Sequence, residues 1–481
     1  MKIFSKCISG DKNIKGGFRE MVAIALPMVV SQACFTIMTF TDRMFLSRLG
    51  LNFMNASMVG GLTVFMMMTF FLGLTGYATA VVAQYLGAGQ KDKCSVVLTQ
   101  AVIIAFLGYP LIVFCRPLAH RLFDIMGIMP DQLGPQKLYF DILIGAVIIT
   151  LLRSCLSAFF SGIGKTKMVM ISGLVAMSVN VVVNYILIFG KFGVPAMGIT
   201  GAAYGTIIGS FSGLAVLFIS YFGKENFRKF NVSRSFRFNG EVMGTLLRFG
   251  YPAGLEMFLN LLAFDIIVMI FHSVGAVAAT ASTIVFNWDM VSFVPLMGIG
   301  VGVTSLVGRY MGAHEPDTAH KATMSGLKVG MIYSALVFIL FAGFPEILAG
   351  IFRPDTAESV FGSALPATVF MIRLASIYVL AEAIFVVFIG ALRGAGDTFW
   401  AMFISVALHW VLVPILYIML KVANSGLETA WQGVVGMFLL FSVFVYLRYR
   451  GGRWRTISVV KIPEAVSMPV VLNDFHEPAD L

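Results

Sequence analysis

The sequence contains two copies of one pattern, and this internal repeat limits the fold more than any other feature. A shift of 225 positions places Pro27 on Pro252 without a gap. The same shift aligns further identical residues, namely Met44 with Met269, Gly50 with Gly275, Ala56 with Ala281, Ser57 with Ser282, Gly73 with Gly298, Thr79 with Thr304, Val82 with Val307, Tyr85 with Tyr310, Gly87 with Gly312 and Ala88 with Ala313. The segments 161–166 and 393–398 match at an offset of 232. The chain therefore consists of two homologous halves.

The composition indicates what these halves are made of. Of the 481 residues, 58% are hydrophobic and only 12% are charged, whereas soluble proteins carry about 25% charged residues. The 48 glycines and 29 methionines are typical of packed membrane helices and adaptable surfaces. We therefore predict an all-α membrane protein that crosses the bilayer many times.

The charge and the cysteines exclude several functions. The net charge of +10 comes from basic residues in loops beside apolar segments, where they set membrane orientation, so we expect no nucleic-acid partner. The five cysteines lack paired spacing and predict neither disulfides nor a metal site. We also expect no cofactor. The first apolar segment, 21–41, is too long for a signal-peptide core and should remain as a helix.

Twelve apolar segments are long enough to cross the membrane, since about 20 residues span a hydrocarbon layer of roughly 30 Å. In the first half they are 20–46, 55–83, 96–115, 138–160, 168–190 and 201–222. In the second half they are 246–271, 279–306, 326–350, 366–391, 398–422 and 428–447.

Basic loops predict the orientation in the plasma (inner) membrane. Positive residues cluster before the first span, in the connector between the halves and after the last span: Lys2, Lys6, Lys12, Lys15, Arg19, Lys224, Arg228, Lys229, Arg234, Arg237, Arg448, Arg450, Arg453, Arg455 and Lys461. Both termini are therefore expected in the cytoplasm. The loop that contains Arg116, Arg121 and Lys137 departs from this rule.

Six spans per half give both copies the same orientation, so a pseudo-twofold axis should run along the membrane normal. We predict an N-terminal lobe at 1–222, a cytoplasmic linker at 223–245, a C-terminal lobe at 246–447 and a cytoplasmic tail at 448–481. Secondary transporters use this plan, with the substrate site between the halves.

Ionisable residues inside the spans are the candidates for function, because each is costly in the membrane unless it faces protein or water. They are Asp42, Arg153, Glu256, Asp265, Asp289, Glu382 and His409. The acids have no acidic counterpart in the other half, so the shared architecture alone does not explain them.

In the first half, Asn180 and Asn184 lie one helical turn apart, and Thr206 begins the next span. Together with Asp42 they offer one carboxylate and several neutral oxygens, which suits a monovalent cation or a proton. The alternative is that Asn and Thr only hold neighbouring helices together.

In the second half, Tyr378 and Glu382 are also one turn apart and could hold a cation by charge and by cation–π attraction. Alternatively, Tyr378 anchors at an interface and Glu382 pairs with Arg373 or Arg153. Glu256 and Asn260 form another such pair. Asp289 and His409 are weaker candidates without an evident partner, and Asp265 is expected to be paired structurally.

These residues carry a resemblance to the multidrug and toxic compound extrusion (MATE) family over nearly the whole chain. The motifs are Leu26-Pro27, Asp42, 83–89, 195–206, Tyr378, Glu382 and 392–398. The resemblance implies an antiporter of organic, often cationic drugs, coupled to Na⁺ or H⁺ and acting as a monomer in the lipid bilayer. By position it implies a cation site in the first lobe, formed by Asp42, Asn180, Asn184 and Thr206. It also implies a site in the second lobe, typical of the NorM-like branch, formed by Tyr378 and Glu382.

The chain departs from this pattern in the second half. Asn260 stands where that branch has Glu, and Asp289 is an extra acid near Asn287, so Glu256, Asn260, Asn287 and Asp289 are further candidates for substrate binding or coupling. We hypothesise that Glu256 pairs with Glu382; the alternative is a solvated charge at the helix end.

Three other functions are less consistent with the sequence. A lipid-linked oligosaccharide flippase of the same superfamily would need several arginines in its cavity, whereas Arg153 stands alone. A membrane-embedded enzyme would need a nucleophile–base pair, a ligand cluster or a phosphate loop. A channel would not need different acids in its two halves.

Overall fold

The computed structural model describes residues 14–125, 130–353 and 358–460. The first half contains α2 (Phe18–Ser47), α3 (Leu51–Gly76), α4 (Ala78–Gly87), α5 (Lys91–Phe114), α6 (Arg116–Ile125), α7 (Pro130–Gly145), α8 (Val147–Gly162), α9 (Thr166–Phe189) and α10 (Gly198–Tyr221). The connector carries α11 (Lys224–Lys229) and the short turn Val232–Arg234. The second half contains α12 (Gly240–His272), α13 (Ala276–Gly312), α14 (Pro316–Gly343), α15 (Pro345–Gly350), α16 (Glu358–Ala395), α17 (Thr398–Tyr417), a π-helical turn (Ile418–Val422) and α18 (Leu427–Arg450), followed by a 3₁₀ turn (Arg453–Thr456).

Within the described residues, eleven helical segments are long and apolar enough to cross a membrane. Helices α7 and α8, which meet at a bend of 46°, pass the same test together and give a twelfth segment if the pair is counted as one span. The predicted fold class is therefore confirmed, although some ends differ. Helix α12 begins at Gly240 rather than at residue 246, because the Asn239 side chain accepts a hydrogen bond from Val242 N (3.0 Å) and caps the helix. Of the predicted tail, residues 461–481 lie outside the described residues.

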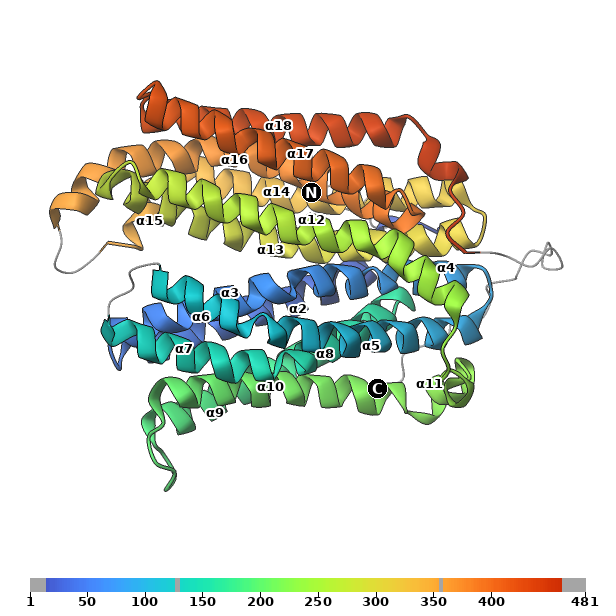
Figure 1. Cartoon of the computed structure of the whole chain (residues 1–481). Helices are drawn as coiled ribbons and strands as arrows, with labels where there is room; N and C mark the ends of the chain where they lie inside the picture. The colour runs from blue at the N-terminus through green and yellow to red at the C-terminus, as the bar shows by residue number, and fades with distance from the viewer. Residues whose placement is uncertain (1–13, 126–129, 354–357, 461–481) are drawn as a thin grey trace.

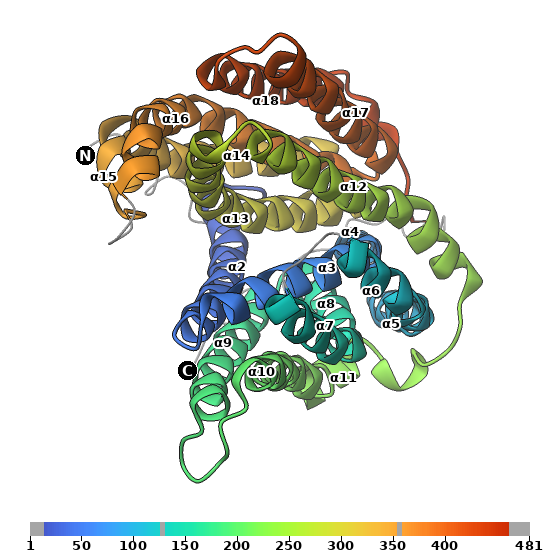
Figure 2. The same ribbon diagram turned by 60° about the vertical axis from the view of Figure 1, so that its left-hand side comes forward.

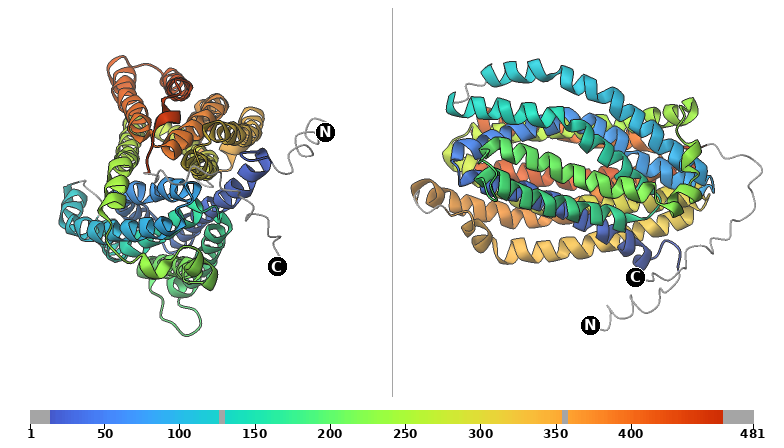
Figure 3. Two further views of the ribbon diagram at one scale, coloured as in Figure 1. Left: turned by 90° about the vertical axis from the view of Figure 1, so that its right-hand side faces the viewer. Right: turned by 90° about the horizontal axis from the view of Figure 1, so that it is seen from below.

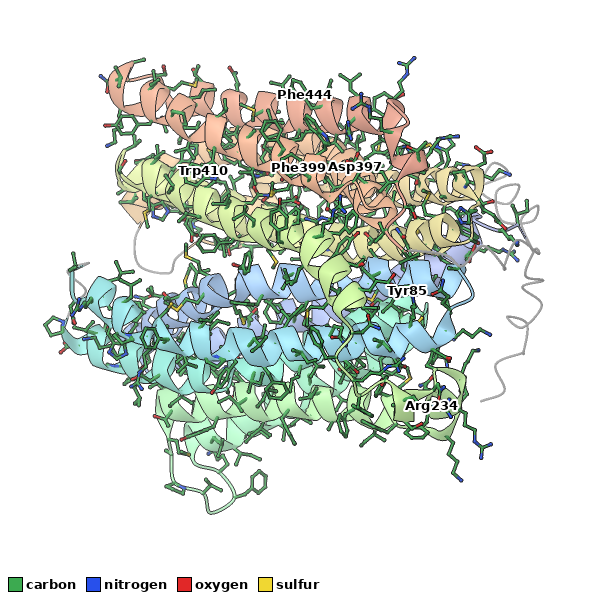
Figure 4. The ribbon with its side chains drawn as sticks, turned by 45° about the vertical axis from the view of Figure 1, so that its right-hand side comes forward. Tyr85, Arg234, Asp397, Phe399, Trp410 and Phe444 are labelled. Carbon is green, nitrogen blue, oxygen red and sulfur yellow. The ribbon has the colours of Figure 1, made fainter. Side chains whose placement is uncertain are left out.

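The helices form two lobes that correspond to the two halves of the sequence. Figures 1 and 2 show α2–α10, in blue to green, on one side and α12–α18, in yellow-green to red, on the other. The end-on and lower views in Figure 3 show that the helices of both lobes run roughly along one common direction. On the outer surface of the second lobe, large apolar side chains such as Phe399, Trp410 and Phe444 are exposed (Figure 4), as expected for a lipid-facing surface.

Glycines bring the two lobes into direct backbone contact, and they do so in pairs. A Cβ added to Gly73 would lie 2.6 Å from the carbonyl oxygen of Ala253, and one added to Gly298 would lie 2.7 Å from Val29 N. Two further glycines repeat this relation: Gly87 against the carbonyl of Arg309 and Gly312 against the carbonyl of Gln84. Adding or subtracting 225 converts the Gly87–Arg309 contact into the Gly312–Gln84 contact. The same operation converts Gly73–Ala253 into Gly298–Met28, and the observed atom belongs to the next residue, Val29. Such reciprocity is the property of a twofold interface.

The lobes also make polar contacts, and these gather at one end of the bundle. We call it the basic end, because Lys15, Lys93, Lys165, Arg234 and Arg455 lie there; Figure 4 shows Arg234 in the connector. Hydrogen bonds between the lobes at this end include those from Tyr310 Oη to Glu20 Oε2 (2.7 Å), from Gln84 Nε2 to the carbonyl of Gly394 (2.8 Å) and from Ser305 Oγ to the carbonyl of Ser161 (2.6 Å).

Candidate functional site

The acid of the first lobe lies in a partial ring of neutral side chains. Asp42, on α2, is 6% exposed. Asn184 Nδ2 donates to one of its carboxylate oxygens, and Thr206 Oγ1 donates to the other at 3.0 Å. Asn180 Nδ2 lies 3.5 Å from the Thr206 hydroxyl. The structure thus brings together all four residues that the sequence analysis proposed for this site.

The same ring contains oxygens that have no partner. The side-chain carbonyl oxygens of Asn180 and Asn184 are buried, and neither accepts a hydrogen bond. Buried acceptors of this kind are costly unless a ligand or proton donor reaches them. One carboxylate, two amide oxygens and a hydroxyl form a donor set that fits a small monovalent cation.

Glycines on α10 determine how closely α9 approaches, and therefore where the two asparagines lie. A Cβ at Gly205 would overlap the Asn184 side-chain oxygen, and a Cβ at Gly209 would lie 2.6 Å from Asn180 Cβ. Small residues permit this close helix packing inside membranes. The spacing of these two glycines therefore positions the ring around Asp42.

We expect Gly205→Ala to impair transport at least about tenfold, because the methyl group displaces the Asn184 amide and removes a hydrogen bond to a charged group. Uptake of a fluorescent substrate by everted vesicles measures the effect. Gly362→Ala is the matched control, since a Cβ there meets no atom within 4 Å. Equal activity of the two variants would show that the ring tolerates displacement of Asn184.

A second acidic cluster lies in the second lobe and joins α13 to α16. Tyr378 Oη donates to Asp289 Oδ1 at 2.7 Å. Glu382, one turn along α16, lies close enough to the same Asp289 carboxyl group to interact with it, and its Oε2 atom is buried without a partner. Two carboxyl groups can hydrogen-bond only if one of them carries a proton. A proton between these two acids would therefore stabilise the cluster.

This arrangement corrects the partners suggested for Glu382. Arg373 pairs instead with Glu346 at 3.0 Å, on the exposed surface. Asp289, a weak candidate in the sequence, is the central residue of the cluster. The sequence could not indicate this contact, because 89 residues separate Asp289 from Tyr378 and only the packing of α13 against α16 joins them.

Glu256 occupies neither of its two expected environments. It is 3% exposed, so it is not a solvated end charge, and it pairs with Arg393 at 2.8 Å rather than with Glu382. Asn260, one turn further, donates to Ser405 Oγ on α17 (2.7 Å). Residues 256 and 260 therefore connect α12 to neighbouring helices and do not reach the Asp289 cluster.

The remaining candidates lie apart from both acidic sites. Asn287 is exposed and donates to the carbonyl of Thr283 (2.7 Å) within its own helix. His409 Nδ1 lies 2.8 Å from the carbonyl of Ser405, and its ring packs against Phe441. Asp265 is half-buried and forms no ion pair or hydrogen bond with another described residue, so the expected structural pairing is wrong.

Comparison with known proteins agrees with the repeat. A model of the MatE family matches residues 27–186 and 252–418, which are the corresponding parts of the two halves. The chain belongs to the MatE family. Among MatE relatives, a probable multidrug resistance protein NorM from Thermotoga maritima is 27% identical over 92% of this chain and 94% of its own. The multidrug resistance protein MdtK from Yersinia enterocolitica is 26% identical over 90% of this chain and 95% of its own.

Solved structures show the same fold. A multidrug resistance MATE family transporter in an outward-facing conformation superposes with a TM-score of 0.83 at 19% identity, covering 92% of this chain and 97% of the other. A transporter of the MOP superfamily from Pyrococcus furiosus, described as having a binding pocket of reversed polarity, gives the same TM-score, identity and coverage.

Proposed function

We propose that this MatE protein is a secondary multidrug efflux transporter that exchanges organic, often cationic compounds for Na⁺ or H⁺. The observation that carries the proposal is the buried Asp42 carboxylate, which is surrounded by neutral donors and unpaired oxygens. Asp42 forms no ion pair within the described residues, although Arg43 acts on it electrostatically, and a buried charge that is not paired is costly. It is stable only when a cation or proton occupies the site, and this is the property a coupling site needs. The names of the NorM and MdtK relatives support multidrug substrates.

The two halves move against each other at the glycine interface, and this movement exposes the binding sites first to one side of the membrane and then to the other. The basic end faces the cytoplasm of the plasma membrane, with both termini on that side. The outlying Arg116 and Lys137 pair with Asp141 (2.7 Å) and Asp124 (2.5 Å), which weakens their effect on orientation. The lobes are in contact at the basic end, which supports an outward-facing state.

Neutralisation of Asp42 drives the cycle. A cation or proton that binds from outside replaces the positive charge of a drug, and the drug leaves. The neutral site then tolerates the inward-facing state, where the ion is released and a new drug binds. The Asp289–Glu382 pair can take up a second charge in the other lobe by gaining or losing its shared proton.

Counterflow of a fluorescent organic cation in proteoliposomes tests this function. A sodium gradient and a proton gradient are imposed separately, with empty liposomes as the control. We expect saturable uptake that one of the two gradients accelerates and that the Asp42→Asn variant lacks. Uptake that neither gradient changes would contradict antiport.

We expect Asp289→Asn and Glu382→Gln each to reduce transport, and the double variant to be little worse than either one. The reason is that the two carboxyl groups share one proton and act as one unit. Initial rates in proteoliposomes measure the effect. Glu346→Gln, which changes a surface pair on neighbouring helices, is the control, and additive losses would show that the two acids act separately.

A further inference from the structure

A second charged group of opposite sign lies inside the first lobe. Arg153 is on α8, nine residues before the end of the helix at Gly162, which is roughly 14 Å at 1.5 Å per residue. It is half-buried, and it forms no ion pair, hydrogen bond or ring contact with another residue in the described part of the chain. An arginine within a membrane bundle normally pairs with an acid or with carbonyls, so this one is available for a ligand.

The surroundings of Arg153 leave room for its guanidinium group. A Cβ added to Gly213 of α10 would lie only 3.1 Å from Arg153 Nε. The Cys34 thiol of α2 is close enough to interact electrostatically with the guanidinium group. Ser172 of α9 donates to the carbonyl of Gly213 (2.8 Å), which holds this part of α10 in place. The arginine therefore lies among α2, α9 and α10, the three helices that also form the Asp42 site.

The two charges are separated along the lobe. Cys34 precedes Asp42 by eight residues on α2, and Gly213 follows Thr206 by seven residues on α10. Both helices place the guanidinium group roughly 10–12 Å from Asp42, on the side of the basic end. The interior of the lobe therefore has a negative group and a positive group about one drug-sized molecule apart.

We propose that Arg153 binds an oxyanion of the transported compound and so determines how well this transporter accepts organic molecules that carry a carboxylate. Arginine suits this task because its planar fork matches a carboxylate. Lipid headgroups lie at the membrane surfaces and not at this depth, so the oxyanion belongs to a substrate. This inference rests on the proposed drug transport.

Rhodamine 110 and its methyl ester, rhodamine 123, form a matched pair of probes that differ only in a free carboxylate. Fluorescence anisotropy measures their binding to the purified protein, and proteoliposome uptake measures their transport. We expect Arg153→Gln to weaken binding of rhodamine 110 by about tenfold or more, the size expected for loss of a hydrogen bond to a charged group. Binding of rhodamine 123 should change less than about twofold by the same reasoning. Arg153→Lys should restore part of the difference, and Gly213→Ala should reproduce the loss by displacing the guanidinium group.

Arg116→Gln is the matched control, because it removes one positive charge from the same lobe at an exposed site. Equal weakening of both probes by Arg153→Gln, or no weakening of either, would overturn the inference. A wild-type protein that binds rhodamine 110 through Arg153 but transports neither probe would contradict the proposed transport and support the oxyanion site.

Discussion

Asp42→Asn is expected to abolish drug export while the protein still folds and reaches the membrane. The amide has nearly the same shape as the carboxylate and can still accept a hydrogen bond from Thr206, so packing should be kept. It cannot alternate between a charged and a neutral form, and the exchange cycle therefore stops. Drug resistance of expressing cells, together with uptake in proteoliposomes, measures the loss, which should reach the background of empty membranes.

Asp124→Asn serves as the control for this variant, because it changes an exposed acid that pairs with Lys137 in the same lobe. Thermal unfolding of both purified variants separates a folding defect from a transport defect. Drug resistance retained at the wild-type level by Asp42→Asn would contradict the role assigned to this carboxylate.

Gly87→Ala is expected to force the lobes apart at the basic end. The added methyl group would overlap the carbonyl oxygen of Arg309, and a backbone atom in a packed interface has little freedom to move away. The transporter should then favour the conformation that is open on the basic side. Gly312→Ala should do the same, since it overlaps the carbonyl of Gln84.

Maleimide labelling measures this change in the conformational equilibrium. The Ser305→Cys substitution is introduced into a protein whose native cysteines are replaced, and the labelling rate of the new cysteine is followed. Ser305 is fully buried between the lobes, so its cysteine should be protected in the closed state. We expect Gly87→Ala to raise the labelling rate by about tenfold or more. A tenfold increase corresponds to a change of about 1.4 kcal/mol in the free energy between the closed and open conformations. Gly244→Ala is the control, because a Cβ there meets no atom within 4 Å, and equal labelling in both backgrounds would exclude the effect.

The sequence predicted the fold and the grouping of the four first-lobe residues, because the repeat and the residue spacing are visible in the sequence. The repeat aligned Gly87 with Gly312, and the one-turn spacing of Asn180 and Asn184 predicted a shared face that the structure shows around Asp42. The Asp289 cluster and the Glu256–Arg393 pair left no such signal. Their partners come from other helices, and the rotation of α13 and α12 about their axes decides which acid meets which residue.

The reciprocal glycine contacts have a consequence for the speed and the sharpness of the conformational change. Each contact has a partner on the opposite side of the pseudo-twofold axis, so a rigid tilt of one lobe strains both members of a pair together. A backbone-to-backbone seam contains few long side chains that could adjust one after another. The seam should therefore separate in a single cooperative event, and partly opened intermediates should be sparsely populated.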